Sequence, residues 1–280
     1  MPDKPLIVDL HCHSTASDGT LPPAGVLKRA AEQGVDVLAL TDHDSTAGLD
    51  EAQRQAVESG VQLIPGIEIS TTWQGKLLHI IGLNIDPDSK PLQKGLGALQ
   101  DMRDQRAHDM GLSLKKKAGI EGAEEAAREL AGTGMVTRTH FARFLINAGI
   151  AKDMKQVFKR YLVSGKPGYS RVDWVDVSEA IEWINGSGGC AVLAHPLRYR
   201  LTANWLNRVL TAFCEQGGIG MEVVCGNHTV DDTARAAVFA RKHGLQASVG
   251  SDFHDPGPWI ELGRLGRMPD GLQPVWQQWL

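Results

Sequence analysis

The stretch LIVDLHCHSTASDGT, from Leu6 to Thr20, joins a short apolar run to a polar loop that contains two histidines and an aspartate. An apolar run of this length with polar residues after it predicts a buried strand. Side chains alternate along a strand, so His11 and His13 point to one face and Cys12 to the other. Two imidazoles at a strand end are half of a metal site, although a pair of solvated histidines gives the same pattern. The remaining sequence distinguishes these interpretations.

The composition is that of an ordinary globular protein. The chain has 280 residues, of which 42% are hydrophobic and 22% charged, which fits one sizeable domain or a domain with an insertion. Its net charge of −4 argues against duplex DNA and membranes as partners, so an anionic substrate must be attracted locally. A signal-peptide pattern and apolar runs of membrane-spanning length are both missing, and we expect a cytoplasmic protein. The four cysteines lack metal-site and disulfide spacing, and no feature indicates an oligomeric state.

Strands and helices alternate at intervals of about 30 residues, which is typical of βα units. A hairpin turn is predicted at Trp73–Lys76. We predict an α/β fold, a distorted seven-stranded TIM-like barrel, with strands at 6–8, 35–40, 61–69, 77–83, 190–194, 220–224 and 245–249. The predicted intervening helices are 24–33, 47–58, 178–185, 203–215 and 230–243.

The strand pattern is interrupted between the fourth and fifth strands. We predict a helical insertion, or cap, over 87–166, and a barrel formed by 1–86 and 167–280. The predicted helices of the insertion are 92–117, 122–131, 140–148 and 154–161. Arg138 and His140 follow a glycine-rich turn and open a helix, where free backbone N–H groups and a cation can bind an anion.

Nine histidines and carboxylates occupy predicted strand ends or the loops that follow them. The carboxyl ends of barrel strands meet at one face, so we expect these side chains to converge. Imidazoles and carboxylates suit zinc, manganese and iron, and nine ligands imply two or three ions. Multinuclear sites of this kind hydrolyse phosphate esters. The nine candidate ligands are His11, His13, Asp18, His43, Glu68, His79, His195, Asp252 and His254.

Six motifs carry a family resemblance: DLHCHSTASDGTLPP, TDHDS, PGIEIS, LHIIG, AHP and GSDFHDPG. Together they resemble the polymerase-and-histidinol-phosphatase (PHP) family of metal phosphoesterases over nearly the whole chain. The resemblance implies a seven-stranded barrel with two or three divalent metals, manganese first, with iron or zinc as alternatives. It implies a first metal on His11, His13, Glu68 and Asp252, a second on Glu68, His79 and His195, and a third on Asp18, His43 and His254.

Within the family, three features resemble the TrpH/YciV-like branch of nucleoside 3′,5′-bisphosphate phosphatases: Asp18 in SDG, RTHFAR and EVVCGNHT. This branch implies release of the 3′-phosphate as the reaction, and 5′-to-3′ hydrolysis of short 5′-phosphorylated RNA as a related activity. The implied mechanism is attack by a hydroxide between two metals, with Asp18 or His254 protonating the leaving oxygen. Candidate substrate-binding residues are Arg103, Arg106, Arg138, His140, Asn227 and His228.

Three alternatives remain open on the sequence. A histidinol-phosphate phosphatase of the same family needs a pocket for an imidazole and an ammonium. A proofreading exonuclease module is disfavoured, because there is no basic stripe for duplex DNA. A non-catalytic metal-binding regulatory domain is disfavoured because all nine candidate ligands are present. Glu222 either orients the site or is a buried structural carboxylate.

Overall fold

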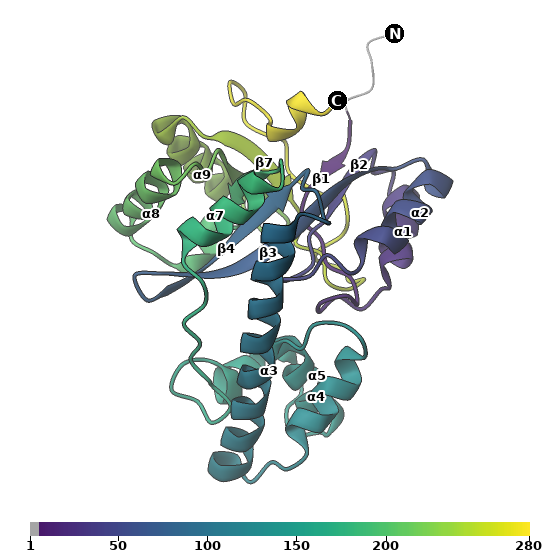
Figure 1. The fold of residues 1–280 in the computed structure, drawn as a ribbon, viewed down its shortest axis with the longest axis vertical. Coiled ribbons are helices and arrows are strands. Elements are labelled where there is room, and N and C mark those ends of the chain that lie inside the picture. The colour runs from purple at the N-terminus through teal and green to yellow at the C-terminus, as the bar shows by residue number, and fades with distance from the viewer. Residues whose placement is uncertain (1–5) are drawn as a thin grey trace.

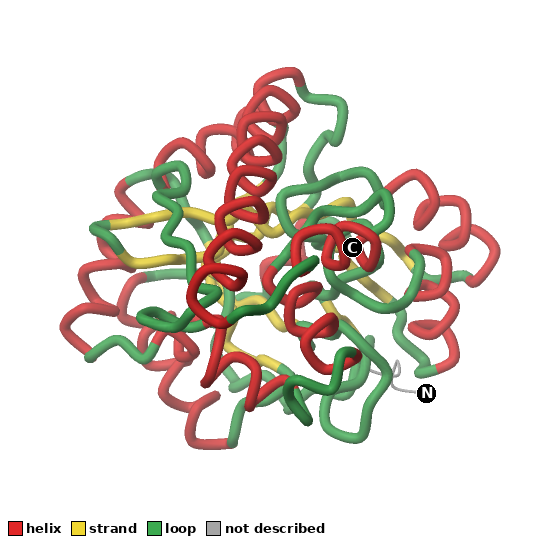
Figure 2. The backbone as a smooth tube through the Cα atoms, turned by 90° about the horizontal axis from the view of Figure 1, so that it is seen from below, coloured by secondary structure: helices red, strands yellow, loops and turns green. Residues whose placement is uncertain are grey.

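The computed structural model describes residues 6–280, which form a seven-stranded sheet in the order β1 to β7. A backbone hydrogen bond from Leu10 to Val249 joins the first strand to the last, so the sheet is nearly closed into a barrel. Figure 2 shows the strands in the middle, with helices around them. The predicted α/β barrel of seven strands is therefore confirmed. The strands are β1 (Val8–Asp9), β2 (Val37–Leu40), β3 (Gln62–Trp73), β4 (Lys76–Leu83), β5 (Cys190–Leu193), β6 (Gly220–Cys225) and β7 (Gln246–Gly250).

Helices cover the outside of this barrel. Two of them lie on the side of β1 and β2, and three lie on the side of β5 to β7 (Figure 1). The strands between them are short and apolar, and β2 and β5 are buried along their whole length, as is typical of strands covered on both faces. The covering helices are α1 (Pro23–Glu32), α2 (Leu49–Ser59), α7 (Val177–Gly186), α8 (Ala203–Glu215) and α9 (Val230–His243), with short 3₁₀ segments at Pro196–Tyr199 and Val275–Gln278.

The hairpin between β3 and β4 departs from the parallel pattern. Gln74 and Gly75 both have positive φ, 45° and 71°, which is the backbone of a two-residue hairpin turn. The predicted turn is confirmed, and β4 consequently runs antiparallel to both β3 and β5. The prediction that all nine candidate ligands lie at or after strand ends is wrong for Glu68 and His79, which lie inside β3 and β4. In the hairpin register Ser70 pairs with His79, and Glu68 lies two residues before Ser70 on the same face of β3. The side chains of Glu68 and His79 therefore still reach the same place.

Most of the residues between β4 and β5 form a second, helical part of the molecule, below the barrel in Figure 1. It has its own apolar cluster, which includes Met110, Phe141 and Leu145. We call residues 90–162 the helical unit. It consists of α3 (Lys90–Ala118), α4 (Ala123–Ala131), α5 (Arg138–Asn147), α6 (Met154–Val157) and a π-helical turn, Phe158–Leu162.

The long helix α3 connects the two parts. Its first half contributes Leu92 and Leu99 to the barrel core, and its second half contributes Met110 to the core of the helical unit. Gly95 lies so close to Trp183 of α7 that an added Cβ would stand 2.5 Å from the indole ring. Glycine therefore allows α3 to pack directly on the barrel. Within residues 6–280, no helix combines the length and the apolar character that crossing a membrane requires.

Candidate metal centre and active site

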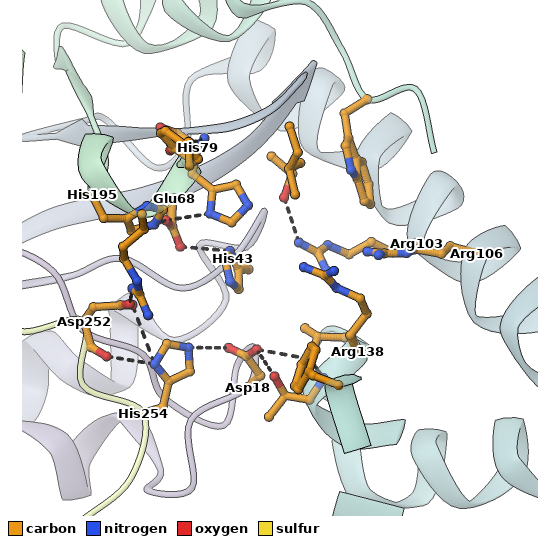
Figure 3. A pocket seen from close by; sticks show the side chains of 18 residues that line it. Asp18, His43, Glu68, His79, Arg103, Arg106, Arg138, His195, Asp252 and His254 are labelled. Carbon is orange, nitrogen blue, oxygen red and sulfur yellow. Dashed lines mark hydrogen bonds and ion pairs between the residues drawn. The ribbon is translucent and has the colours of Figure 1, made fainter. Parts of the chain in front are cut away.

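The nine predicted ligands converge at one end of the barrel. They come from six different places in the chain, and their rings are closely packed: His13 and His254 stack with centroids 4.2 Å apart, and His43 and His79 are 5.0 Å apart. Figure 3 shows the labelled members of the cluster along one wall of a cavity. The sequence predicted this convergence, and the geometry below tests whether it suits metal ions.

Glu68 is at the centre of the cluster. Three imidazole nitrogens lie 2.9 Å from its oxygens and two lie at 3.4 Å. A carboxylate offers about four lone-pair sites, so five imidazoles exceed what hydrogen bonds alone satisfy. One Glu68 oxygen faces two of the rings and the other faces three, which is the arrangement of a carboxylate that bridges neighbouring cations. The five are His11, His13, His43, His79 and His195.

His11 and His13 define the best-formed candidate site. Their Nε2 atoms are 3.1 Å apart, and Glu68 Oε2 lies 3.4 Å from both. On the same pair, Asp252 Oδ1 lies 3.4 Å from His11 and 3.3 Å from His13. Ligand atoms around a tetrahedral zinc-sized cation stand roughly 3.3–3.6 Å apart. Each of the two carboxylates therefore stands at metal-ligand spacing from the His11–His13 pair, and His11, His13 and Asp252 form one group of donors that can hold a cation.

Asp18 lies at the edge of the cluster, beside His254. Its Oδ2 accepts hydrogen bonds from the hydroxyls of Thr137, at 3.1 Å, and Thr139, at 2.9 Å. Its Oδ1 is buried without a hydrogen-bond partner among the described residues, and lies 3.3 Å from His254 Nε2. A buried carboxylate oxygen left in this state is costly unless a cation or a protonated ring faces it. Asp18, His13, His43 and His254 form one group of donors that can hold a metal.

A further carboxylate, Glu222, contacts two of the ligands from behind. Glu222 accepts from His11 Nδ1 at 2.9 Å and from the backbone N–H of His195 at 2.5 Å. A carboxylate on the far nitrogen of a ligating histidine fixes its tautomer and orientation. Of the two interpretations of Glu222, its contacts favour orientation of the site, and its burial agrees with both.

The backbone is strained at two of the ligands. Asp252 and His195 have φ of 56° and 27°, in or near the left-handed region that non-glycine residues rarely adopt. Such conformations cost of order 1–3 kcal/mol and concentrate at functional sites. At both positions the strain lies in the turn that follows a barrel strand and aims the side chain into the cluster.

Burial and mutual attraction set the charges of the cluster. Burial alone would raise the pKa of Asp18, but His254 and His43 bring that pKa well below its usual value. Burial lowers the pKa of His13 to about 3, helped by repulsion from His254. For His254 burial also lowers the pKa, but Asp18 and Asp252 outweigh it and raise the pKa to about 10. Ionised carboxylates beside neutral imidazoles such as His13 are the forms that bind metals.

Three arginines form the facing wall of the cavity, which has a volume of about 260 Å³. Arg103 is fixed by hydrogen bonds to Asp44, at 2.7 Å, and to Ser70, at 3.0 Å. Burial, then Arg138 and Arg103, lower the pKa of Arg106 to about 9. Its Nε is buried without a hydrogen-bond partner in residues 6–280. Guanidinium groups bind phosphates in bidentate geometry, so this wall offers donors suited to a phosphate.

The other predicted substrate-binding residues lie outside this cavity. His140 is buried, and its Nδ1 accepts from the backbone N–H of Thr137, which caps α5. His228 contacts the carbonyl of Val223 and lies in a separate groove along α9, and Asn227 beside it is exposed. The cavity lining therefore includes Arg103, Arg106 and Arg138, and leaves out His140, Asn227 and His228.

Several lining residues were missed by the sequence analysis. Arg198 pairs with Asp252 Oδ2 and lies three residues after His195, a position that the AHP motif could have drawn attention to. Trp174 packs under Arg103 and Arg106, 5.2 and 5.5 Å from their guanidinium carbons, and nothing in the local sequence marks it.

Comparison with known proteins identifies the family of this chain. Residues 9–163 match the model of the PHP domain. The chain is 48% identical to the 5′-3′ exoribonuclease Rnm of Escherichia coli, over 98% of this chain and 94% of that protein. It is 44% identical to a 3′,5′-nucleoside bisphosphate phosphatase of Chromobacterium violaceum, over 97% and 95%. A solved Chromobacterium violaceum structure, described as an amidohydrolase with bound sulfate and no metal, superposes with a TM-score of 0.92 at 43% identity over 97% of this chain and 95% of that one. The resemblance found in the motifs is confirmed, and the chain belongs to the PHP family of metal-dependent phosphoesterases.

Proposed function

We propose that this protein removes the 3′-phosphate of nucleoside 3′,5′-bisphosphates, such as 3′,5′-bisphosphoadenosine, and releases the nucleoside 5′-monophosphate. The observation that carries the proposal is that one cavity has a metal-ligand cluster on one wall and three arginines on the other. A substrate with two phosphates on one ribose has one group for each wall. The relative named as a 3′,5′-nucleoside bisphosphate phosphatase supports this substrate class.

Two to three divalent cations are the proposed cofactors, with manganese first and iron or zinc as alternatives. The proposed ligands are the nine residues of the cluster, in the three sets implied by the family. Bound cations would neutralise phosphate oxygens and lower the pKa of a water molecule. The donor chemistry, imidazole nitrogens with carboxylate oxygens and no thiolate, fits all three metals.

The protein's own residues orient the substrate and supply the proton. Arg103, Arg106 and Arg138 would hold the 5′-phosphate and fix the ribose with its 3′-phosphate toward Glu68. His254 and Asp18 line the same cavity, so a leaving 3′-oxygen there is within reach of both. Where two cations are bound and the third set holds none, we assign proton delivery to His254 and the orientation of its ring to Asp18, which faces its Nε2.

The same reaction extends to RNA. In both substrates the bond that breaks joins phosphorus to the 3′-oxygen of the first nucleoside, and only the other substituent on phosphorus differs. The relative named as a 5′-3′ exoribonuclease supports short 5′-phosphorylated RNA as a second substrate. We propose that the helical unit is the cap that selects the 5′-phosphate for both. A histidinol phosphate would bring its ammonium and imidazole against three guanidinium groups, which disfavours that alternative.

The test is turnover by manganese-loaded protein of 3′,5′-bisphosphoadenosine, 5′-AMP, 3′-AMP, histidinol phosphate and a 5′-phosphorylated RNA oligomer. We expect phosphate release from 3′,5′-bisphosphoadenosine well above release from 3′-AMP, because 3′-AMP lacks the group that the arginines bind. Chelation should abolish turnover, and added manganese should restore it. Preference for histidinol phosphate, or no turnover by protein shown to contain metal, would overturn the proposal.

A further inference from the structure

A second groove meets the active-site cavity at the metal-ligand cluster. It has a volume of about 290 Å³ and shares Arg198, Asp252 and His254 with the arginine-walled cavity. Its far end is formed by Pro258, Trp259 and Ile260. In Figure 3, Asp252 lies on the side of the cluster opposite Arg103 and Arg106. The groove therefore leads away from the site that we assign to the 5′-phosphate.

Trp259 is presented to solvent by an anchored segment. Its side chain is 86% exposed, although the residues on both sides of it are held. The Pro258 carbonyl accepts a hydrogen bond from Arg264 at 2.7 Å, and Ile260 packs against the barrel core. A large indole that is carried by an anchored backbone and left uncovered beside a catalytic centre is a ready surface for stacking a base, and such stacking tolerates any base.

The chemistry of the proposed RNA reaction requires a place for a second nucleotide. Water adds its oxygen to phosphorus, the bond from phosphorus to the first 3′-oxygen breaks, and that oxygen takes a proton. The phosphate stays on the 5′-oxygen of the second nucleotide. When the first nucleoside lies in the arginine-walled cavity and the phosphorus lies at the cluster, the second nucleotide of the bound RNA must extend through another opening. The groove along Asp252 is an opening that touches the same ligands.

We propose that this groove is the binding site for the second nucleotide of 5′-phosphorylated RNA, and that Trp259 stacks on its base. This inference rests on the proposed function and adds the residue that distinguishes RNA from a bisphosphate. Arg198, which is 41% exposed and lines both cavities, lies at the junction where the phosphate between the two nucleotides would be held. The shortened RNA keeps a 5′-phosphate on its new first nucleotide, and this phosphate can then enter the arginine-walled cavity.

The experiment compares kcat/KM for a 5′-phosphorylated dinucleotide, pApA, with kcat/KM for 3′,5′-bisphosphoadenosine in each variant. Their ratio cancels any loss of active protein. We expect the ratio to fall roughly 5- to 150-fold in Trp259→Ala, the range of one base–aromatic stack, mainly through KM. Trp259→Phe should keep the ratio close to that of the wild type, because its ring can also stack on a base. A pApA analogue without the second base should show no dependence on residue 259.

The matched control is Val230→Ala, at a residue that is 87% exposed on α9 in a different groove. It should leave the ratio unchanged. An unchanged ratio in Trp259→Ala, or an equal fall with the analogue that lacks the second base, would overturn the second-nucleotide site alone. Wild-type protein that cleaves the bisphosphate but not pApA would also overturn it. Wild-type protein that cleaves neither substrate would overturn the proposed function, and this inference with it.

Discussion

The barrel and the helical unit contribute opposite charges to one cavity. The barrel supplies buried carboxylates and imidazoles, and its ligands are fixed by contacts between distant residues, such as His11 with Glu222. The helical unit supplies Arg103, Arg106 and Arg138, carried by helices that pack around their own apolar cluster. The difference suggests a division of labour in which the barrel holds the reacting group and the helices recognise the rest of the substrate. Substitutions in the barrel should therefore lower metal content and turnover, whereas substitutions in the helical unit should weaken substrate binding.

The largest effect should come from the barrel ligands. Asp252→Asn and His43→Ala each remove a metal donor from the cluster. Substitution of a residue that only contacts a metal ligand typically costs roughly 10- to 100-fold in activity, and we expect turnover to fall by more than that in both variants. Metal content per chain should fall with it. Lys116→Ala, on the exposed far part of α3, should change neither. Equal activity in all three variants would contradict the metal-centre assignment.

Arg138→Gln should separate recognition from metal binding. Loss of a charged hydrogen-bond donor in the cavity should raise KM for 3′,5′-bisphosphoadenosine about 10- to 100-fold, while metal content stays at the wild-type value. Arg128→Gln is the matched control, since Arg128 belongs to the same unit and pairs with Asp104 outside the cavity. An equal change in KM for both variants, or loss of metal in Arg138→Gln, would contradict the division of labour.

The barrel and most of its ligands could be predicted because the signals are local. His11, His13 and His43 follow short apolar runs, and parallel strands bring such positions together whatever the details of packing. Glu68 and His79 were predicted to converge because both were expected at strand ends; they do converge, but they lie inside β3 and β4. The reversal of β4 takes both away from strand ends, and the hairpin register then brings them together again.

The substrate side of the cavity could be predicted less well, because its contacts depend on how the helical unit docks. Thr137 and Thr139 reach Asp18 across 119 and 121 residues, and no spacing in the sequence reports that distance. His140 is a candidate substrate-binding residue in the sequence, yet its ring nitrogen accepts a hydrogen bond at the start of α5. Trp174 and Trp259 lie in irregular segments, where hydrophobic periodicity gives no indication of direction.

The contact between the two regions can be tested at Thr139. Thr139→Val keeps the shape of the side chain and removes the hydroxyl that donates to Asp18, so we expect about tenfold weaker binding of one cation. The remaining cations should bind as before, because within residues 6–280 Asp18 is the one ligand that forms hydrogen bonds with α5. Calorimetric titration of metal-free protein with manganese measures this directly. Thr133→Val, at an exposed turn, is the control, and uniform weakening of every site would contradict the link.

The smallest expected effect concerns the stability of the helical unit in mild acid. Burial, with smaller contributions from Arg143 and Arg103, lowers the pKa of His140 to about 4 against the attraction of Asp18. The unfolded chain takes up this proton near pH 6.5, so it binds more protons than the folded chain between pH 6.5 and pH 4, and stability falls as the pH falls through that window. His140→Gln keeps an acceptor for the Thr137 N–H and does not titrate. From pH 7 to pH 5 the wild type should therefore lose up to about 2 kcal/mol more unfolding free energy than the variant, measured by urea titration. Parallel losses in the two proteins would mean that His140 is not buried in its neutral form.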